Sequence, residues 1–204
     1  MAWRRIGAAD HRAMPWKNGG GSTAEIAIAP PGASVAGGFD WRLSIATIQG
    51  DGPFSAFPGY DRTILLLAGK GMVLTVAGQA PHALDRPFVP FRFSGQAATD
   101  CQLLDGPCED LNLMAARDRF AAETAMWTAG AAWIAPRPPE NPRSATTTLV
   151  FVCRGEITLA AADGDMVLGT RDTLVFDAGT TATLRHASAG ATALVARLTE
   201  LAKS

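Results

Sequence analysis

The chain has 204 residues, 48% of them hydrophobic and 18% charged, so it can bury a sizeable core as one large domain or two small ones. A formal net charge of −1, with no run of lysines or arginines, argues against nucleic acid as a direct partner. No apolar run reaches the roughly 18 residues of a membrane span, and no apolar segment follows Arg4 and Arg5 as a signal peptide requires.

The first half reads as short strands separated by glycine, proline and aspartate turns. Alternating or continuous apolar runs predict strands at 25–28, 41–45, 62–67, 72–76, 88–93, 100–104 and 110–114. The segment Gly69-Lys70-Gly71 predicts a tight hairpin between the third and fourth of these strands. Strands at this spacing favour an antiparallel sandwich or barrel over alternating strands and helices.

The second half repeats this β pattern after a proline-rich segment. Residues 115–127 are ambiguous, because their alanines favour a helix while the segment could also be a strand that links two sheets. The four prolines of residues 135–142 cannot occupy a central strand or helix, so a loop between two halves is expected there. Further strands are predicted at 146–153, 155–160, 166–168, 174–176 and 191–198. Two β-barrel halves in tandem summarise the pattern.

The segment at residues 15–23, Pro-Trp-Lys-Asn-Gly-Gly-Gly-Ser-Thr, carries the strongest functional signal. Three consecutive glycines permit a sharp turn, and successive amides in such a turn form a concavity that binds anions. Lys17 adds a positive charge, Trp16 adds a flat apolar wall, and Asn18 lies between Lys17 and the glycines. A plain surface turn after an aromatic residue is the alternative, and a glycine cluster alone would favour it.

Neither metal chemistry nor nucleophilic chemistry is indicated, and no cofactor is expected. A metal site needs three or four converging ligands, whereas His11, His82 and His186 lie far apart and form no His-x-His pair. No serine lies in a Gly-x-Ser-x-Gly motif, and no cysteine or serine stands out as the partner of a histidine base. The three cysteines lack a Cys-x-x-Cys spacing, which indicates free thiols in a reducing cytoplasm, although proximity would permit a Cys101–Cys108 bridge.

Strand parity gathers polar side chains on single faces of the predicted strands. Arg42 and Ser44 lie opposite the apolar residues of strand 41–45, and Asp110 and Asn112 do the same on strand 110–114. Such a face looks either to solvent, the commoner case for one strand, or into a wet barrel lumen. Glu25 lies on a similar strand just after the glycines.

Arg62 begins the most apolar predicted strand, where a charge is costly without a partner. Asp61 is expected to cap the preceding turn or to form a structural ion pair with Arg62. Positive groups, acceptors and flat walls together would suit a small anionic metabolite, because arginine binds carboxylates in a bidentate manner. The candidate ligand-binding residues are Trp16, Lys17, Asn18, Glu25, Arg42, Ser44, Phe57, Arg62 and Asn112.

Four motifs, in order, resemble the HutD/Ves family. They are residues 15–23 followed by Glu-Ile-Ala at 25–27, then residues 39–46, 52–62 and 110–114. The match covers roughly the first 115 residues, whereas the second half is similar only in its β pattern and length. Leu111 is a mild departure, since the family often has a phenylalanine there.

The resemblance implies an all-β bicupin, in which one chain forms two antiparallel double-stranded β-helix (jelly-roll) barrels. The first barrel would span residues 1–115 and the second residues 116–204, with strands exchanged between the halves as an option. The usual cupin metal ligands are missing. HutD proteins are regarded as regulators of histidine utilisation, with urocanate or formylglutamate as suggested ligands, whereas Ves proteins are linked to cold and stress responses. Cupins often dimerise, so a homodimer is plausible.

The leading hypothesis is therefore a cytoplasmic regulator of histidine utilisation that binds a small carboxylate in a metal-free cupin pocket. For urocanate, Lys17 and one of the two arginines would hold the carboxylate, and Trp16 would stack on the ring. Glu25 or Asn112 would accept the imidazole N–H.

Two other hypotheses stay open. The first is an enzyme that acts on an anionic intermediate of the same pathway, with Lys17 and Glu25 as an acid–base pair. The second is a stress-related interaction protein of the Ves type. An exposed apolar face around Trp127 and Trp133 would support the latter, although buried tryptophans are expected.

Overall fold

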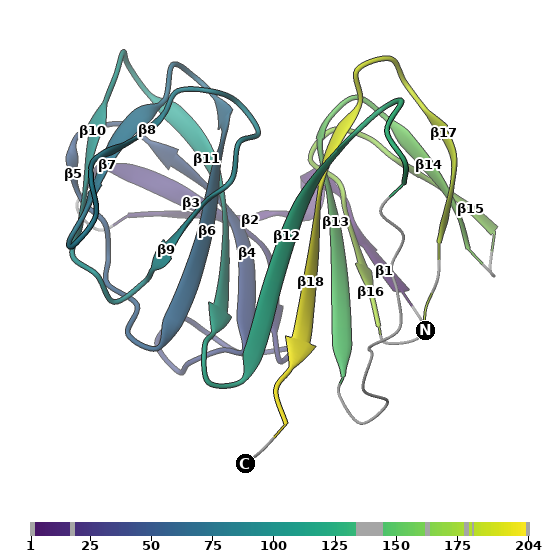
Figure 1. The fold of residues 1–204 in the computed structure, drawn as a ribbon, viewed down its shortest axis with the longest axis horizontal. Helices are drawn as coiled ribbons and strands as arrows, with labels where there is room; N and C mark the ends of the chain where they lie inside the picture. The colour runs from purple at the N-terminus through teal and green to yellow at the C-terminus, as the bar shows by residue number, and fades with distance from the viewer. Residues whose placement is uncertain are drawn as a thin grey trace. The chain divides into compact units, whose positions relative to one another are not determined.

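The computed structural model describes residues 3–16, 19–133, 145–161, 164–177, 180 and 182–202. Within these ranges the chain is all-β, with eighteen strands, one short 3-10 turn and no α-helix (Figure 1). None of the helical structure in this part of the chain is long and apolar enough to cross a membrane. The proline-rich segment at 135–142 lies outside the described residues.

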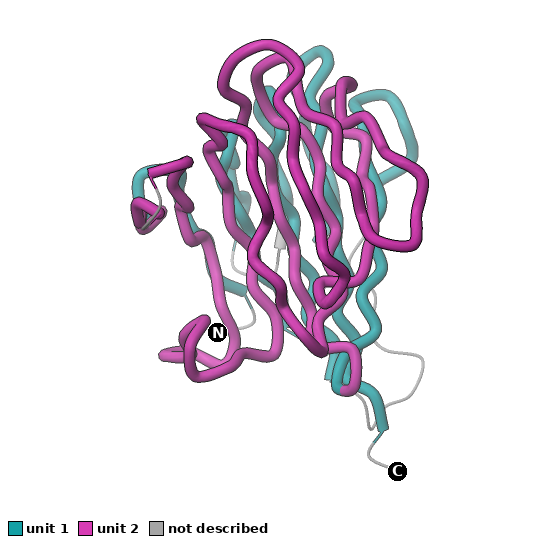
Figure 2. The backbone as a smooth tube through the Cα atoms, turned by 90° about the vertical axis from the view of Figure 1, so that its left-hand side faces the viewer, with its two compact units in different colours: residues 1–10, 119–204 teal, residues 11–118 magenta. Residues whose placement is uncertain are grey.

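The chain divides into two compact units, coloured in Figure 2. Residues 11–118 form one, called the central unit here, and residues 1–10 with 119–204 form the other, called the terminal unit. The first ten residues thus belong with residues 119–204 and not with the segment that follows them. The expected boundary between two cupin barrels after residue 115 stays a prediction.

The central unit consists of two antiparallel sheets. The six-stranded sheet has the order β2-β3-β4-β11-β6-β9, and the four-stranded sheet has the order β5-β10-β7-β8. The bounds are β2 (Arg12–Pro15), β3 (Gly21–Ala29), β4 (Trp41–Ile48), β5 (Gly52–Pro53), β6 (Tyr60–Ala68), β7 (Met72–Val76), β8 (His82–Leu84), β9 (Phe91–Ser94), β10 (Thr99–Leu103) and β11 (Cys108–Ala116). Both sheets contribute to one apolar core, with Ile48, Ile64 and Leu66 from the larger sheet and Met72 and Leu74 from the smaller.

The expected hairpin at residues 69–71 is wrong. Strand β6 pairs with β9 and β11, whereas β7 pairs with β8 and β10, so the turn carries the chain from one sheet to the other. Gly69 and Gly71 have φ of 90° and 94°, a region that side chains disfavour. A Cβ on Gly71 would collide with the carbonyl group of Leu84. These glycines therefore mark a turn correctly, but close approach of other segments, not hairpin geometry, requires them.

The terminal unit contains a five-stranded sheet with the order β1-β16-β13-β18-β12 and a three-stranded sheet with the order β15-β14-β17. The bounds are β1 (Trp3–Ile6), η1 (Ala8–Asp10), β12 (Phe120–Thr128), β13 (Thr146–Arg154), β14 (Ile157–Ala161), β15 (Gly164–Leu168), β16 (Thr173–Phe176), β17 (Thr183–Ala187) and β18 (Thr192–Glu200). Its interior is an apolar core, in which Trp127, Leu159, Leu168 and Phe176 are buried.

The ambiguous segment at 115–127 is a strand, not a helix. Strand β11 ends at Ala116, and β12 begins at Phe120. Strand β12 pairs along its whole length with β18, from Phe120 opposite Glu200 to Thr128 opposite Thr192. A full antiparallel ladder outweighs the helix propensity of alanine, which is worth less than about 1 kcal/mol per residue.

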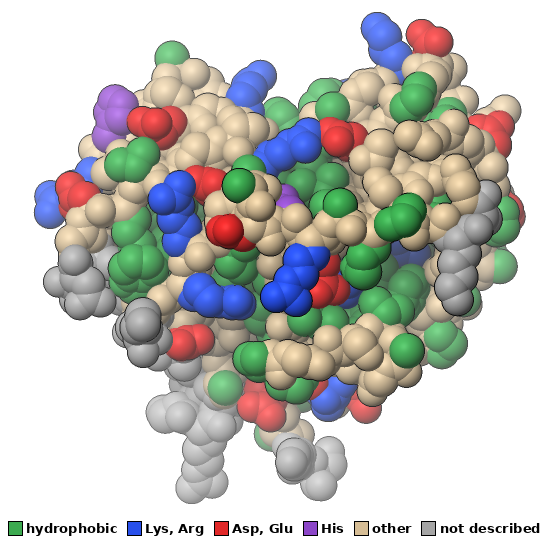
Figure 3. Space-filling view, turned by 180° about the vertical axis from the view of Figure 1, so that it is seen from behind, with side chains coloured by type: hydrophobic (Ala, Val, Ile, Leu, Met, Phe, Trp, Pro, Cys, Tyr) green, Lys and Arg blue, Asp and Glu red, His purple; other side chains and the backbone are tan. Residues whose placement is uncertain are grey.

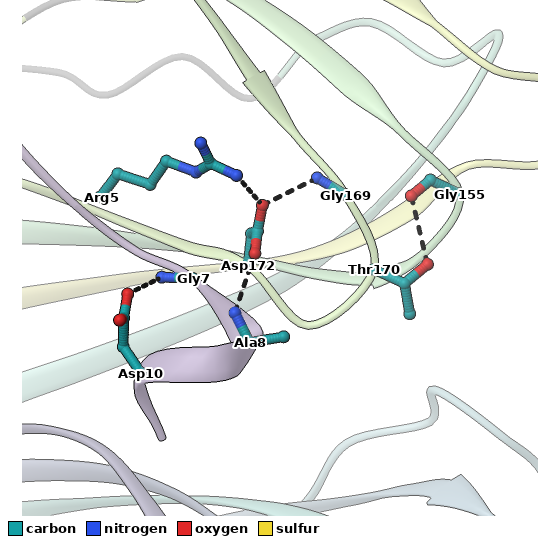
Figure 4. A network of polar contacts seen from close by, with 8 residues as sticks. All are labelled: Arg5, Gly7, Ala8, Asp10, Gly155, Gly169, Thr170 and Asp172. Atoms are coloured by element: carbon teal, nitrogen blue, oxygen red, sulfur yellow. Dashed lines mark hydrogen bonds and ion pairs between the residues drawn. The ribbon is translucent and has the colours of Figure 1, made fainter. Parts of the chain in front are cut away.

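The carboxylate of Asp172 holds the N-terminal strand in the terminal unit (Figure 4). Its Oδ2 accepts hydrogen bonds from Arg5 Nη2 at 2.7 Å and from the Gly169 amide at 3.0 Å, and its Oδ1 accepts one from the Ala8 amide at 3.0 Å. Burial alone would raise the pKa of Asp172, but these hydrogen bonds and the Arg5 charge outweigh burial and lower that pKa. The ionised carboxylate therefore stabilises the fold.

We expect the variant Asp172→Asn to lower the free energy of unfolding by about 2 kcal/mol, because an amide forms weaker bonds with Arg5 and the two amide groups. Thermal denaturation at neutral pH measures this loss. Since the folded-state pKa is depressed, the difference from wild type should shrink as the pH falls below about 4. The matched control is Asp10→Asn, which alters an exposed carboxylate that binds the Gly7 amide. Equal melting temperatures for wild type and Asp172→Asn would contradict this prediction.

Candidate functional site

A cavity of about 460 Å³ opens inside the central unit. Its polar lining is Thr23, Arg42, Ser44, Ser55, Arg62, Asp110 and Asn112. Its apolar lining is Pro15, Trp16, Ala46, Pro53, Phe54, Phe57 and Met114. The volume lies within the range of about 300–1,000 Å³ that is typical of small-molecule sites.

The register of β4, β11 and β6 explains how these side chains meet. Residues of one face form rows across the three strands, namely Arg42–Met114–Arg62, Ser44–Asn112–Ile64 and Ala46–Asp110–Leu66. The last row adjoins the apolar core, since Ala46 and Leu66 belong to that core. Asp110 therefore lies at the inner end of the polar face, and the two arginines lie two rows away from it.

Arg42 is neutralised within the cavity wall. Its Nε donates to Glu25 Oε2 at 2.8 Å, and its Nη1 donates to Ser44 Oγ at 3.3 Å. Both side chains of this ion pair are largely buried, at 6% and 17% exposed. Glu25 itself is not part of the cavity lining. A buried pair of this kind orients Arg42 and leaves little net charge for a ligand.

Arg62 is a buried cation with few polar partners. Its Cζ lies 5.0 Å from the ring centroid of Phe93, 5.2 Å from that of Phe54 and 5.6 Å from that of Phe57. Nη1 makes a long hydrogen bond of 3.4 Å to the Ser55 carbonyl oxygen, and Nε has no hydrogen-bond partner. Burial lowers the pKa of Arg62 to about 10, against the opposing effect of Asp110, so the guanidinium stays charged at neutral pH.

Asp110 and Asn112 have buried acceptor oxygens that receive no hydrogen bond. Asp110 is fully buried, and neither of its carboxylate oxygens has a hydrogen-bond partner. The Oδ1 atom of Asn112 is likewise buried and unpartnered. Burial raises the pKa of Asp110 to about 7, with Arg62 acting in the opposite direction and Glu109 adding to the rise. Buried polar groups nearly always have partners, so a cluster of exceptions inside one cavity points to a bound molecule.

Comparison with known proteins identifies the family. The sequence model of the HutD family matches residues 8–194 of the chain. An uncharacterized 21.2 kDa protein in the hutC 3′ region of Pseudomonas putida is 40% identical over 168 residues, which are 82% of this chain and 83% of that protein. The chain belongs to the HutD family.

Two further relatives agree with membership of the HutD family. The solved structure of HutD from Pseudomonas fluorescens SBW25 matches with a TM-score of 0.78 at 34% identity, over 98% of this chain and 100% of that one. Protein Ves from Citrobacter koseri is 42% identical over 118 residues, which are 56% of this chain and 60% of that protein. The resemblance to the HutD/Ves family is thereby confirmed.

A more distant match bears on the fold alone. A Cupin 2 conserved barrel domain protein from Leptotrichia buccalis matches with a TM-score of 0.54 at 9% identity, over 88% of each chain. The all-β fold of this HutD-family protein is therefore cupin-like.

Most of the predicted site residues meet in the cavity. Trp16, Arg42, Ser44, Phe57, Arg62 and Asn112 all line it. The polar faces of β4 and β11 thus look into the cavity and not to solvent. Glu25 reaches this HutD-family site only through its ion pair with Arg42. Lys17 and Asn18 lie outside the described residues.

Asp61 does not pair with Arg62. Consecutive strand residues point to opposite faces, so the Asp61 side chain lies on the outer face of β6. There its carboxylate binds Arg92 at 3.0 Å and Arg117 at 2.7 Å. Asp61 is thus part of a structural ion pair, as expected, but with different partners, and Arg62 is left for the cavity.

The described glycines of the loop support Trp16. The Gly19 amide donates to the Trp16 carbonyl oxygen at 3.1 Å, which closes the turn. A Cβ on Gly21 would collide with the carbonyl oxygen of Thr47 and lie 3.1 Å from the Trp16 ring. The indole Nε1 donates to Thr23 Oγ1 at 2.8 Å. The Gly19 amide and the indole N–H are therefore engaged internally, and Trp16 offers the cavity a flat wall.

Sequence reasoning missed Asp110 as a site residue, although its parity with Asn112 on β11 was a sufficient signal. Ser55 and Phe54 were also missed, because they lie in a segment without regular structure. Long-range backbone hydrogen bonds position that segment, with the Phe54 amide bound to the Thr99 carbonyl oxygen and the Phe57 amide bound to that of Gly95. No local pattern announces these contacts.

The described part of the chain contains no cluster of three or more His, Cys, Asp or Glu side chains that could hold a metal. All three cysteines are free and buried, so the possible Cys101–Cys108 bridge is wrong. Burial raises the pKa of Cys101 to about 12 and that of Cys108 to about 11, which keeps both thiols neutral.

Proposed function

We propose that this protein is a cytoplasmic regulator of histidine utilisation that binds a small carboxylate, such as urocanate or formylglutamate, without a metal. The observation that carries the proposal is Arg62, a buried guanidinium that lines the cavity with an unpartnered Nε. A cation buried at this depth is costly unless an anion or a set of acceptors satisfies it. A ligand carboxylate would do so in the bidentate geometry that arginine favours.

The other cavity walls suit a flat organic acid. Trp16 and Phe57 provide aromatic surfaces, and the cavity volume of about 460 Å³ accommodates a molecule of the size of urocanate. Asn112 offers an acceptor for an imidazole N–H, whereas Glu25 is occupied by Arg42. Family membership supports the link to histidine utilisation. The P. putida relative is named as a protein of the hutC 3′ region, and its name states no activity.

The fold and partners complete the proposal. We propose two cupin barrels in one chain, supported by the two compact units and the cupin-like fold. Three free cysteines support a reducing compartment. On the face drawn in Figure 3, basic side chains lie among acidic ones, which supports a small molecule over nucleic acid as the direct partner. A homodimer stays a prediction that light scattering would test.

An enzyme is the second candidate, and the raised pKa of Asp110, about 7, favours it. A carboxyl group with such a pKa exchanges protons readily near neutral pH, and Arg62 beside it would hold an anionic substrate. In this second candidate Asp110, and not Lys17 with Glu25, would supply the acid–base group. The interaction protein has less support, because Trp127 is buried and packs edge-on against Trp133 at 5.2 Å.

Calorimetric titration with urocanate, formylglutamate, histidine and formate tests the proposal. We expect saturable binding of urocanate or formylglutamate, unchanged by a chelator. At ~100 times its dissociation constant the ligand should stabilise the fold by roughly 2.7 kcal/mol, a rise of several degrees in melting temperature. An intact ligand after overnight incubation indicates a binding protein, and its consumption indicates the enzyme. The proposal fails if none of the four acids binds.

A further inference from the structure

The buried atoms without a hydrogen-bond partner at the inner end of the cavity are all acceptors. Both carboxylate oxygens of Asp110 and the Oδ1 of Asn112 are buried and have no hydrogen-bond partner. At the other end of the polar face, the unpartnered atom is a donor, Arg62 Nε. The two residues Asp110 and Arg62 stand two rows apart on the same face of the sheet. The cavity therefore has two ends of opposite chemical character.

Resting on the proposed function, we propose that the ligand carries a single anionic group for Arg62 and, at its other end, an N–H donor for Asp110 and Asn112. Asp110 is then the residue that determines specificity. It favours planar acids with a ring N–H, such as urocanate, over acids with a second carboxylate, such as formylglutamate.

The charge balance of the cavity supports one anionic group and not two. Arg42 is already neutralised by Glu25, so Arg62 is the cation that remains for a ligand among the described lining residues. A second ligand carboxylate at the inner end would face the oxygens of Asp110 and Asn112 in a site of low dielectric constant, where like charges repel strongly. An N–H group would instead satisfy acceptors that nothing else in the described chain satisfies.

The titration of Asp110 gives this arrangement a pH dependence. The titratable and charged side chains that interact with Asp110 come from β6, β10 and β11 itself, and they are Arg62, Cys101, Cys108 and Glu109. Arg42 on β4, which forms an ion pair with Glu25 on β3, lies two rows away from Asp110. The two thiols stay neutral, so the charge of Asp110 changes mainly against Arg62 and Glu109. A ligand N–H stabilises the ionised carboxylate, and its binding should therefore tighten as the pH rises through about 7.

A pair of matched acids tests the inference on the full chain. Urocanate and 3-(furan-3-yl)acrylate have the same acrylate and a ring of similar size, but the furan lacks the N–H. We expect wild type to bind urocanate about ten-fold more tightly than the furan at a pH of about 8, the strength of one hydrogen bond to a charged group. In Asp110→Asn this preference should fall to about two-fold or less, whereas Asp100→Asn, an exposed aspartate on β10, should keep it.

Two further arms sharpen the test. When the pH falls from 8 to 6, the affinity of wild type for urocanate should decrease about ten-fold more than the affinity of Asp110→Asn does. The imidazole of urocanate titrates equally in both experiments, so its effect cancels in this comparison. Formylglutamate should bind more weakly than urocanate. Equal binding of urocanate and the furan by wild type, or a preference that survives Asp110→Asn, would overturn the inference but leave the proposed function standing. Binding of formylglutamate without urocanate would likewise overturn the inference alone. If none of the acids binds, the proposed function itself is wrong.

Discussion

Replacing Arg62 by methionine is expected to abolish binding of small carboxylates while the protein stays folded. Methionine keeps much of the volume of the side chain and packs well against aromatic rings, so the contacts with Phe54, Phe57 and Phe93 survive in apolar form. The ligand carboxylate, in contrast, loses the buried cation that it would contact. Truncating one partner of such a charge pair costs about 2–5 kcal/mol, which is at least about a 30-fold loss of affinity.

The fold should tolerate this change because Asp110 can take up a proton. Arg62 lowers the pKa of that carboxyl group, so removing the arginine raises the pKa further and leaves Asp110 neutral at physiological pH. Calorimetry with urocanate measures the affinity, and thermal denaturation measures the stability. The matched control is Arg92→Met on the adjacent strand β9, whose exposed guanidinium binds Asp61 outside the cavity. Undiminished affinity in Arg62→Met would remove this residue from the site.

Replacing Asp110 by asparagine is expected to make the protein more stable at neutral and alkaline pH. The carboxyl group has a pKa of about 7 when folded, well above its ordinary value of 3.8. Between these two pH values the unfolded chain binds fewer protons than the folded chain, so wild type loses stability as the pH rises through this window. A full shift of this size corresponds to about 4 kcal/mol at most, and the neutral amide avoids most of that loss.

Chemical denaturation of wild type and Asp110→Asn at several pH values measures this effect. The two curves of unfolding free energy should lie close together at a pH of about 4 and diverge by roughly 1–4 kcal/mol by a pH of about 8. Asp100→Asn on β10 is the control, because it makes the same change at an exposed aspartate. Parallel curves, or a variant that is less stable at high pH, would show that Asp110 carries no buried charge. A stabilised variant that has lost ligand selectivity would mark Asp110 as a group kept for function.

The pattern of polar and apolar residues was sufficient to predict β4, β6 and β11, the strands that carry most of the polar side chains of the cavity. Period-two alternation in β4 and β11 placed Arg42, Ser44 and Asn112 on one face, and the structure brings that face to the cavity. Alternation cannot reveal whether a face is exposed to solvent or faces the interior, because that depends on whether a second sheet packs against it. Solvent was therefore the commoner expectation for each strand taken alone, and only the coincidence of several polar strands pointed to a shared interior.

Pairings between distant segments were beyond the reach of local patterns. The turn at Gly69 and Gly71 has the composition of a hairpin, yet its strands pair with β11 and β10, which lie far along the chain. The partner of β1 is β16, which lies far along the chain, and Arg5 is held there by Asp172. These strand pairings follow from the burial of whole sheets, so the residues next to each strand in sequence do not indicate its partner.

The pairing of β1 with β16 constrains how the molecule can be dissected. A fragment that begins at Arg119 would contain most of the terminal unit but not β1, so the edge of β16 that carries Arg4 and Arg5 in the intact chain would be bare. Bare strand edges recruit other strands, and such a fragment is a candidate for aggregation or for swapping with its neighbours. A permuted gene that encodes residues 119–204 followed by residues 1–10 would keep β1 with the terminal unit. It would produce that unit without the central unit and its cavity, and the edge of β16 would stay covered.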